Sequence, residues 1–179
     1  LALLNQLEKH LTDSSVIVSY NGKSFDVPHI RSRYQYFDWP NPLEDHHHID
    51  LLHLVRRIWK ARLPNRSLGQ IETKILNVQR SEEDIPGWMV AQLYLEYLHT
   101  QDASPLTRIF YHNEIDVISL AMLLDHIARI LSNPLEIDIE HGLDLISIGK
   151  LYADMGDLPY SAKIYERGLE FDDVNGKQY

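Results

Sequence analysis

The amino-acid sequence predicts an α/β domain followed by an α-helical hairpin. One β-branched run, residues 16–20, has the composition of a strand. The segments around it carry apolar residues at the spacing of amphipathic helices. Near the C-terminus, small residues and tyrosines follow a pattern that is typical of two closely packed helices.

The N-terminal part predicts a helix, a strand and a second helix. Apolar residues recur at helical spacing over residues 1–11. Residues 16–20 are apolar enough to predict a buried strand. The Asn21-Gly22 pair predicts a turn, and Asp26-Val27-Pro28 opens the next helix with a proline in its first turn.

The rest of the chain is predicted to be mostly helical. Residues 49–54 resemble the end of a strand that runs into a helix through Trp59. Further helices are expected at residues 67–75, 88–98 and 104–131, the first of them capped by Ser67. The Asn133-Pro134 pair predicts a boundary between two domains, residues 1–133 and residues 134–179.

A single confident strand cannot be stable by itself. The sequence also begins within an amphipathic helix and without a starting Met. We therefore expect the first domain to be N-terminally truncated, with the partner strands of residues 16–20 lying upstream.

Composition excludes several classes of site. The 179 residues contain no cysteine, which excludes disulfides, thiolate zinc sites and cysteine nucleophiles within this chain. No apolar run is long enough to span a bilayer, and we expect a cytoplasmic protein. The net charge of −9 argues against a protein that coats nucleic acid by charge alone. It does not argue against a metal-dependent nuclease, which needs acidic residues at its centre.

Two carboxylates are candidates for metal-assisted chemistry. Asp26 follows the predicted strand at a helix start, where open α/β sheets collect ligand sites; the alternative is a simple helix N-cap. His112 and Asp116 lie four residues apart on one helix face, so a metal-binding carboxylate and a side chain that orients a water are neighbours. The alternative is an ordinary His–Asp pair on a helix surface.

A basic segment is a candidate for binding phosphates. Its members have no acid between them, and Trp59 lies among them as a possible platform for a base. The alternative is a solvated basic face with Trp59 in the core. The basic residues are Arg56, Arg57, Lys60, Arg62 and Arg66.

A histidine-rich segment gives a weaker signal. His46, His47 and His48 are adjacent, and adjacent histidines seldom point at one zinc ion. Asp50 is of more interest, because it lies where a strand is expected to meet a helix. Arg80 is isolated in the sequence and carries no signal of its own.

Two of these patterns together resemble the DEDD superfamily of 3′–5′ exonucleases. Asn21-x-x-x-Phe25-Asp26 followed by Pro28 looks like its second motif, and His112-x-x-x-Asp116 resembles its third. In that superfamily a Tyr or His precedes the last Asp by four or five residues. Here His112 has the shorter spacing and Tyr111 the longer one, and helix geometry favours His112 as the residue that orients the water.

The residues between these motifs are similar to the YprB-like family of RNase H-like exonuclease domains over roughly residues 1–131. The resemblance implies an incomplete RNase H-like fold with a mixed sheet. It also implies that an Asp-x-Glu of the first motif lies upstream, and that the fragment itself is inactive. The matching residues are Asp50-Leu51-Leu52, Arg56-Arg57-Ile58-Trp59, Leu63, Ser67-Leu68-Gly69, Glu72, Arg80, Asp84-Ile85-Pro86-Gly87, Tyr94 and His112-Asn113.

The C-terminal segment resembles a tetratricopeptide repeat. Gly149, Ser161 and Gly168 are small enough for two helices to approach, and Gly156-Asp157 predicts the turn between them. The alternative is any αα-hairpin. One repeat cannot bury its own face, so we expect further repeats after Tyr179 or a hairpin that docks on the nuclease domain. The resemblance also implies a protein partner for the repeat.

The resemblance implies a metal-dependent 3′–5′ exonuclease that acts on single-stranded DNA or RNA. Asp26 and Asp116 would bind Mg²⁺ or Mn²⁺, and Asp26, His112 and Asp116 would be catalytic. Asn21, Arg56, Arg57 and Lys60 would hold the nucleic acid, and no membrane contact is expected. The alternative is a catalytically degenerate nuclease fold that serves as a platform for nucleic acid or protein.

Overall fold

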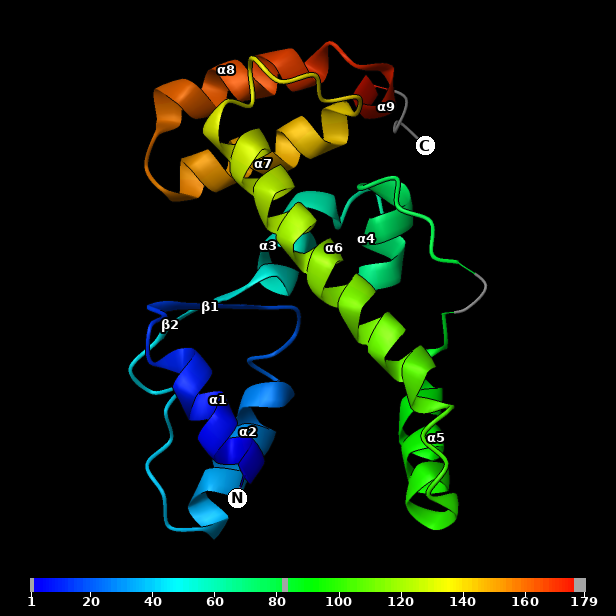
Figure 1. The fold of residues 1–179 in the computed structure, drawn as a ribbon. Coiled ribbons are helices and arrows are strands. Elements are labelled where there is room, and N and C mark those ends of the chain that lie inside the picture. The colour runs from blue at the N-terminus through cyan, green and yellow to red at the C-terminus, as the bar shows by residue number, and fades with distance from the viewer. Residues whose placement is uncertain (1, 82–83, 176–179) are drawn as a thin grey trace. The chain divides into compact units, whose positions relative to one another are not determined.

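The computed structural model describes residues 2–81 and 84–175. These residues form two compact units by their contacts, one made of the chain up to residue 66 together with the chain from residue 129, the other of residues 67–128. The predicted division at residue 133 stays a prediction. Figure 1 labels the elements, which are α1 (Ala2–Leu11), β1 (Val16–Ser19), α2 (Asp26–Tyr36), β2 (His47–Asp50), α3 (Leu51–Trp59), α4 (Leu68–Lys74), α5 (Gly87–Thr100), α6 (Leu106–Ser132), α7 (Gly142–Asp154), α8 (Leu158–Leu169) and α9 (Asp172–Asn175).

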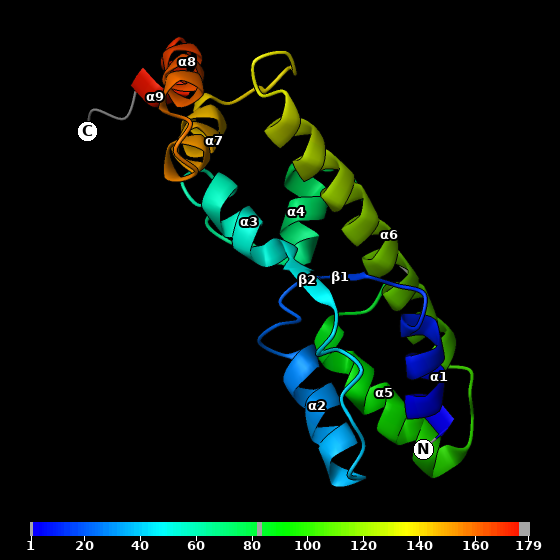
Figure 2. The same ribbon diagram turned by 90° about the vertical axis from the view of Figure 1, so that its left-hand side faces the viewer.

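The first unit contains a βαβ arrangement. β1 and β2 are parallel neighbours with Val16 opposite His47 and Ser19 opposite Asp50, and α2 is the connection between them. Figure 2 shows β2 running directly into α3. The mixed α/β class is therefore confirmed, with a small parallel sheet and mostly helices.

The prediction that β1 is buried was wrong for the described residues. Val16 is 43% exposed and the other three residues are half-buried. The strand pairs with β2, which comes from downstream in the chain, and this one neighbour leaves much of its surface open. Partner strands upstream stay an expectation.

α3 provides the core of the first unit. Its apolar residues recur at helical spacing, and all of them except the half-buried Leu54 are buried; α7 packs against this helix. Trp59 is buried, so the interpretation of this residue as part of the core is favoured over base stacking. The buried residues of α3 are Leu51, Leu52, Val55, Ile58 and Trp59.

α7 and α8 form the predicted C-terminal helical hairpin. A Cβ at Gly149 would lie only 3.0 Å from the Tyr165 ring, so a side chain there would push the helices apart. The Ser161 hydroxyl donates a hydrogen bond of 2.7 Å to the Gly149 carbonyl. Gly156 makes the turn with a φ of +91°, which L side chains rarely adopt.

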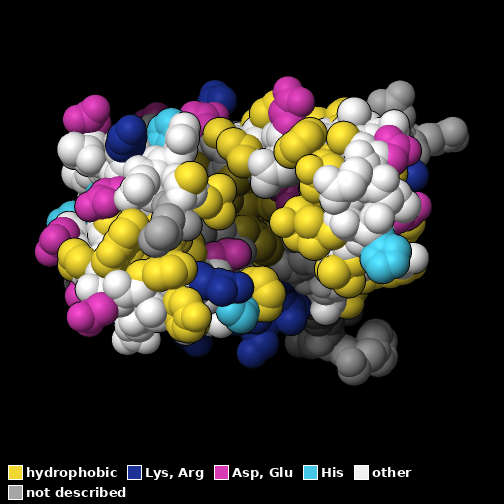
Figure 3. Space-filling view, turned by 60° about the horizontal axis from the view of Figure 1, so that its bottom comes forward, with side chains coloured by type: hydrophobic (Ala, Val, Ile, Leu, Met, Phe, Trp, Pro, Cys, Tyr) yellow, Lys and Arg dark blue, Asp and Glu magenta, His cyan; other side chains and the backbone are white. Residues whose placement is uncertain are grey.

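A hydrogen bond of 2.9 Å from the Tyr34 hydroxyl to the Leu4 carbonyl joins α2 to α1. Between them runs a groove of about 870 Å³, lined by Leu3, Leu7, Ile30 and Tyr36 among others. Figure 3 shows hydrophobic side chains gathered over these two helices.

The second unit consists of α4, α5 and the part of α6 up to residue 128. Its buried apolar residues include Ile71 of α4, Leu123 of α6 and Ile85 in the segment before α5. None of the helices described here combines the length and the apolar character that crossing a bilayer requires.

Candidate functional site

Asp26 is the first residue of α2, just beyond the end of β1. Phe25 is the N-cap and makes no side-chain cap, so the interpretation of Asp26 as an N-cap was wrong. The Asp26 side chain is exposed, and within the described residues its carboxylate makes no hydrogen bond or ion pair. An unpaired carboxylate at this end of a parallel strand is available to a ligand.

Asp50 holds the turn that leads to Asp26. Its carboxylate is buried and accepts the backbone N–H groups of Asn21 at 2.8 Å and Lys23 at 3.0 Å. It also caps α3 by accepting the N–H of Leu52 at 3.1 Å. Asn21 has a φ of +64°, a conformation that these bonds hold in place. Asp50 therefore joins the end of β2 to the predicted Asn21–Asp26 motif.

The electrostatics of Asp50 match this role. Burial by itself would raise the pKa of Asp50, but the hydrogen bonds from the backbone of Lys23, Asn21 and Leu52 outweigh it and hold the pKa below its ordinary value. Asp50 is thus ionised and held by donors.

The strand ends also bring Ser19 and His48 together. The Ser19 Oγ and the His48 Nε2 are 2.7 Å apart. Burial lowers the pKa of His48, and the nearby Lys23 lowers it further. His46 instead contacts the carbonyls of Pro42 and Leu11 through its two ring nitrogens. The adjacent histidines thus have separate partners, which disfavours the zinc alternative.

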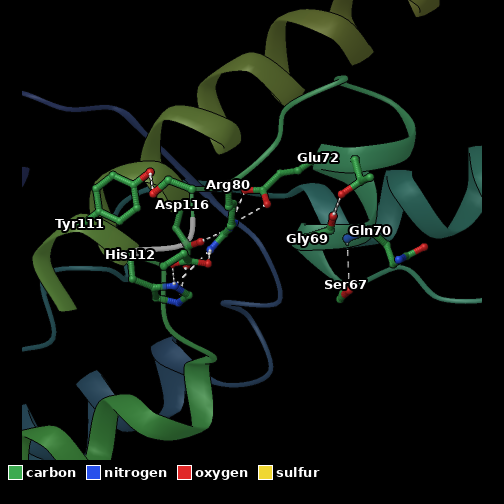
Figure 4. A network of polar contacts seen from close by, with 11 residues as sticks. Ser67, Gly69, Gln70, Glu72, Arg80, Tyr111, His112 and Asp116 are labelled. Atoms are coloured by element: carbon green, nitrogen blue, oxygen red, sulfur yellow. Dashed lines mark hydrogen bonds and ion pairs between the residues drawn. The ribbon is translucent and has the colours of Figure 1, made fainter. Parts of the chain in front are cut away.

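The second candidate group lies in the second unit around Arg80 (Figure 4). Arg80, from the segment between α4 and α5, donates two hydrogen bonds of 2.6 Å to the buried carboxylate of Glu72. Its guanidinium also pairs with Asp84 at 3.1 Å and with Asp116 at 2.5 Å. His112 completes the group, with Nδ1 at 2.7 Å from Asp84 Oδ1 and Nε2 at 3.6 Å from Asp116 Oδ2. We call these five residues the Arg80 cluster.

The cluster carries more negative than positive charge. Three carboxylates surround one guanidinium, and hydrogen bonding to Glu72 above all raises the pKa of Arg80, so this cation is permanent. Burial would raise the pKa of Asp84, but hydrogen bonds from His112 and Arg80 outweigh it and lower the pKa. All of these residues come from α4, α6 and the chain between α4 and α5.

Tyr111 faces a different partner from His112. The Ser81 hydroxyl donates a 2.9 Å hydrogen bond to the Tyr111 oxygen, while His112 lies beside Asp116. This arrangement favours His112 over Tyr111 as the neighbour of Asp116.

Several residues of the basic segment are occupied by internal contacts. Arg62 donates to Asp144 at 2.7 and 3.0 Å, and the Trp59 indole N–H donates to the same carboxylate at 3.0 Å. Arg57 pairs with Asp154, and both side chains stay about half exposed. Arg56 and Lys60 are exposed and form no ion pair within the described residues. Arg56 of α3 and Lys60 at its C-terminal cap thus remain open to a phosphate.

Tyr20 contacts the basic segment and was not identified from the sequence. Its hydroxyl donates to the Arg66 carbonyl at 2.5 Å. Burial raises the pKa of Tyr20 to about 12, although Arg56 and Arg66 act in the opposite direction. Tyr20 therefore stays a neutral donor that fixes Arg66 and the end of β1.

The two predicted metal ligands belong to different units, Asp26 to the first and Asp116 to the second. Across residues 2–81 and 84–175, no three His, Asp or Glu side chains gather so that they would hold a metal ion. Two carboxylates are too few for a pair of hard cations, which take several oxygen ligands each. The described residues therefore do not form a complete metal site.

The roles of Glu72, Arg80 and Asp84 were not predicted from the sequence. Each is an ordinary charged residue at an irregular spacing from the others. The signal that was present is their place in the family pattern, where all three accompany the His112 helix.

Comparison with known proteins agrees with the fold. Residues 2–128 match a family model described as RNase_H superfamily. The chain is similar to "Uncharacterized protein YprB" of Bacillus subtilis (strain 168), with 32% identity over 159 residues that cover 88% of this chain and 38% of that protein. The chain thus spans less than half the length of this relative. No solved structure matches. Because the family model covers most of the chain, this protein belongs to the RNase_H superfamily.

Proposed function

We propose that this chain is part of a metal-dependent 3′–5′ exonuclease that hydrolyses phosphodiester bonds in single-stranded DNA or RNA. The observation that carries the proposal is the pairing of His112 with Asp116 on one face of α6, in a member of the RNase_H superfamily. The exposed carboxylate of Asp26, at the start of the helix that follows β1, is its second support.

Asp26 and Asp116 would supply two of the carboxylates that hold Mg²⁺ or Mn²⁺. The ions, when bound, stabilise the charge that develops on the phosphate oxygens. Because two carboxylates are insufficient, the proposal requires further acidic ligands besides Asp26 and Asp116. Asp116 would also have to exchange its ion pair with Arg80 for a metal ion.

His112 would orient the attacking water and accept its proton at Nε2. The water oxygen forms a bond to phosphorus, the bond from phosphorus to the 3′ oxygen breaks, and the leaving oxygen takes a proton from solvent. A shortened strand and a nucleoside 5′-monophosphate result. Asp116 lies close enough to Nε2, at 3.6 Å, to stabilise the imidazolium.

The nucleic-acid backbone would follow α3 and the turn beside it. Arg56 and Lys60 are the exposed cations with no acidic partner among the described residues. Arg57 would join them by releasing Asp154, since an exposed pair costs little to break. Asn21 is also proposed to contact the nucleic acid, because the hydrogen bond from its backbone N–H to Asp50 holds the turn in place.

We also propose that α7 and α8 form a tetratricopeptide-like unit that binds a protein partner or a further repeat. The close contact of Gly149 with Tyr165 and the turn at Gly156 support this interpretation. Exposed Leu158 and Leu169 on α8 leave apolar surface for such a neighbour.

The test is an Mn²⁺ titration with a 5′-labelled single-stranded oligonucleotide, using the parent protein extended upstream. We expect Mn²⁺-dependent shortening from the 3′ end, and its loss in Asp116→Asn. Glu114→Gln, which alters an exposed acid on the same helix, is the matched control and should retain activity. Full activity of Asp116→Asn would exclude the assignment.

A degenerate nuclease fold that serves as a binding platform is the second candidate. The ion pairs of Asp116 with Arg80 and of Arg62 with Asp144 favour it, because they satisfy charges that a nuclease would use. Binding of the oligonucleotide with no cleavage of DNA or RNA under the same conditions would support the platform.

A further inference from the structure

The imidazole of His112 is held between two carboxylates. Its Nδ1 is 2.7 Å from Asp84 Oδ1, and its Nε2 is 3.6 Å from Asp116 Oδ2. A Cβ added to Gly87 would make ordinary van der Waals contact with Nε2 at 3.9 Å. Nδ1 thus has a close acceptor, whereas Asp116 lies beyond hydrogen-bond distance of Nε2.

The neighbours of Nδ1 determine where its proton lies. Arg80 Nη1 is 3.1 Å away and can only donate, whereas the Asp84 carboxylate can only accept. Nδ1 cannot satisfy both groups. The shorter contact is the one to Asp84, and Arg80 Nη1 has another acceptor in Asp84 Oδ2 at 3.1 Å. The neutral ring therefore carries its proton on Nδ1 and its lone pair on Nε2.

Asp84 is fixed in the position that this bond requires. Arg80 is anchored to the buried Glu72 through two hydrogen bonds and presents its Nη1 to Asp84. A backbone hydrogen bond from Asp84 to the Ser81 carbonyl at 3.1 Å holds the main chain. The carboxylate that faces His112 is thus ordered by its own partners.

We propose that Asp84, held by Arg80, is a positioning residue that fixes the proton of His112 on Nδ1 and so directs the Nε2 lone pair toward the attacking water. The inference rests on the proposed function, in which His112 accepts the proton of that water. When Nε2 takes this proton, Asp84 stabilises the positive charge on the ring.

The first test measures the tautomer directly, in the 179-residue chain and without any activity. Nitrogen–proton correlation spectra of the imidazole rings at alkaline pH report which nitrogen is protonated, and His112→Gln identifies the His112 signals among the ten histidines. We expect the proton on Nδ1. A proton on Nε2 in the wild-type chain would overturn the inference.

Asp84→Asn sharpens this test. Because Arg80 only donates, the new amide oxygen turns toward Arg80 and the NH₂ group turns toward Nδ1. Nδ1 then becomes an acceptor, and the His112 proton moves to Nε2. Asp84→Glu keeps a carboxylate and should keep the proton on Nδ1, as should Glu114→Gln. An unchanged tautomer in folded Asp84→Asn would contradict the proposal.

The second test uses the parent protein. Asp84→Asn should lower kcat by about 100-fold or more while KM changes little, because the wrong tautomer removes the base and not the binding. An unchanged kcat in Asp84→Asn would contradict the proposed role of Asp84 but leave the exonuclease assignment intact. A parent without nuclease activity would instead remove the proposed function, and the tautomer measurement would still decide the role of Asp84.

Discussion

Arg80 and Asp116 form an ion pair of 2.5 Å between the segment before α5 and the middle of α6. The same guanidinium is bound to Glu72, whose side chain is 1% exposed. Arg80 thus links a fully buried acid to the carboxylate that the proposed function assigns to a metal ion. This relationship makes Arg80 the first residue to alter.

Arg80→Leu should lower the free energy of unfolding by about 3–5 kcal/mol, because it leaves the buried Glu72 carboxylate without a partner. Urea denaturation followed by circular dichroism measures the loss. In Arg80→Leu with Glu72→Leu, both charges of this pair are gone, so no unpaired Glu72 carboxylate remains and much of the stability should return. Lys74→Gln, at the exposed end of α4, is the control and should stay within about 0.5 kcal/mol of wild type. Equal stability of Arg80→Leu and Lys74→Gln would contradict the prediction.

Asp50→Ala should destabilise the first unit by about 3 kcal/mol, because it removes a helix cap and leaves the N–H groups of Asn21 and Lys23 without their acceptor. Hydrogen exchange of these two amides should accelerate more than that of α8 amides. Asp50→Asn retains one acceptor oxygen and should fall between wild type and Asp50→Ala. Unchanged exchange at Asn21 and Lys23 would show that Asp50 does not hold the turn.

Stability should depend on Asp50 in acid. Burial would raise the pKa of this carboxyl, but backbone hydrogen bonds outweigh it, so the folded pKa lies below the ordinary 3.8. Such a group stabilises the fold fully above its unfolded pKa, and the contribution is lost as the pH falls through the folded pKa. The unfolding free energy should therefore decline from about pH 5 downward, and less steeply in Asp50→Asn. Parallel pH profiles of the two proteins would exclude this contribution.

Asp144 and Asp154 should differ strongly in their effects although both pair with an arginine of the α3 region. Asp144 is buried and accepts from Arg62 and Trp59, so Asp144→Ala should cost about 3–5 kcal/mol. Asp154 is exposed with Arg57, so Asp154→Ala should cost at most about 1 kcal/mol. Thermal unfolding of the two variants measures the difference. Similar losses would mean that the Asp144 contacts do not secure α7 on α3.

The 179-residue chain alone should show no metal-dependent nuclease activity, because among the described residues we assign only Asp26 and Asp116 to the proposed ions, and no three ligands gather there. The measurement is the same oligonucleotide assay with Mn²⁺ and with Mg²⁺, with the extended parent as the positive control. Cleavage by the chain alone, lost in Asp116→Asn, would refute the requirement for further carboxylates.

The secondary structure was largely predictable from local patterns. The helices α4, α5 and α6 end within two residues of their predicted bounds, since apolar periodicity and the Ser67 cap act over a few residues. The burial of β1 was not predictable in this way, because it depends on which strands lie beside it. The pairing of β1 with β2 joins residues about thirty positions apart, which no local pattern encodes.

The candidate site was likewise predictable only in part from the sequence. Asp26, His112 and Asp116 were identified by residue type and spacing, and their catalytic roles stay predictions. Arg80 was dismissed as isolated, although its guanidinium contacts three carboxylates from three places in the chain.

The sequence by itself determined most of the helices, the α/β class and the C-terminal hairpin, because these follow from short-range periodicity, and its motifs supplied the resemblance to RNase H-like domains. Only the tertiary structure decided that Trp59 is a core residue, that Asp50 holds the Asn21 turn, and that Arg80 binds Glu72, Asp84 and Asp116. Hydrogen bonds and ion pairs act over a few ångströms in space, whatever the distance along the chain. Their partners are therefore set when the elements pack together.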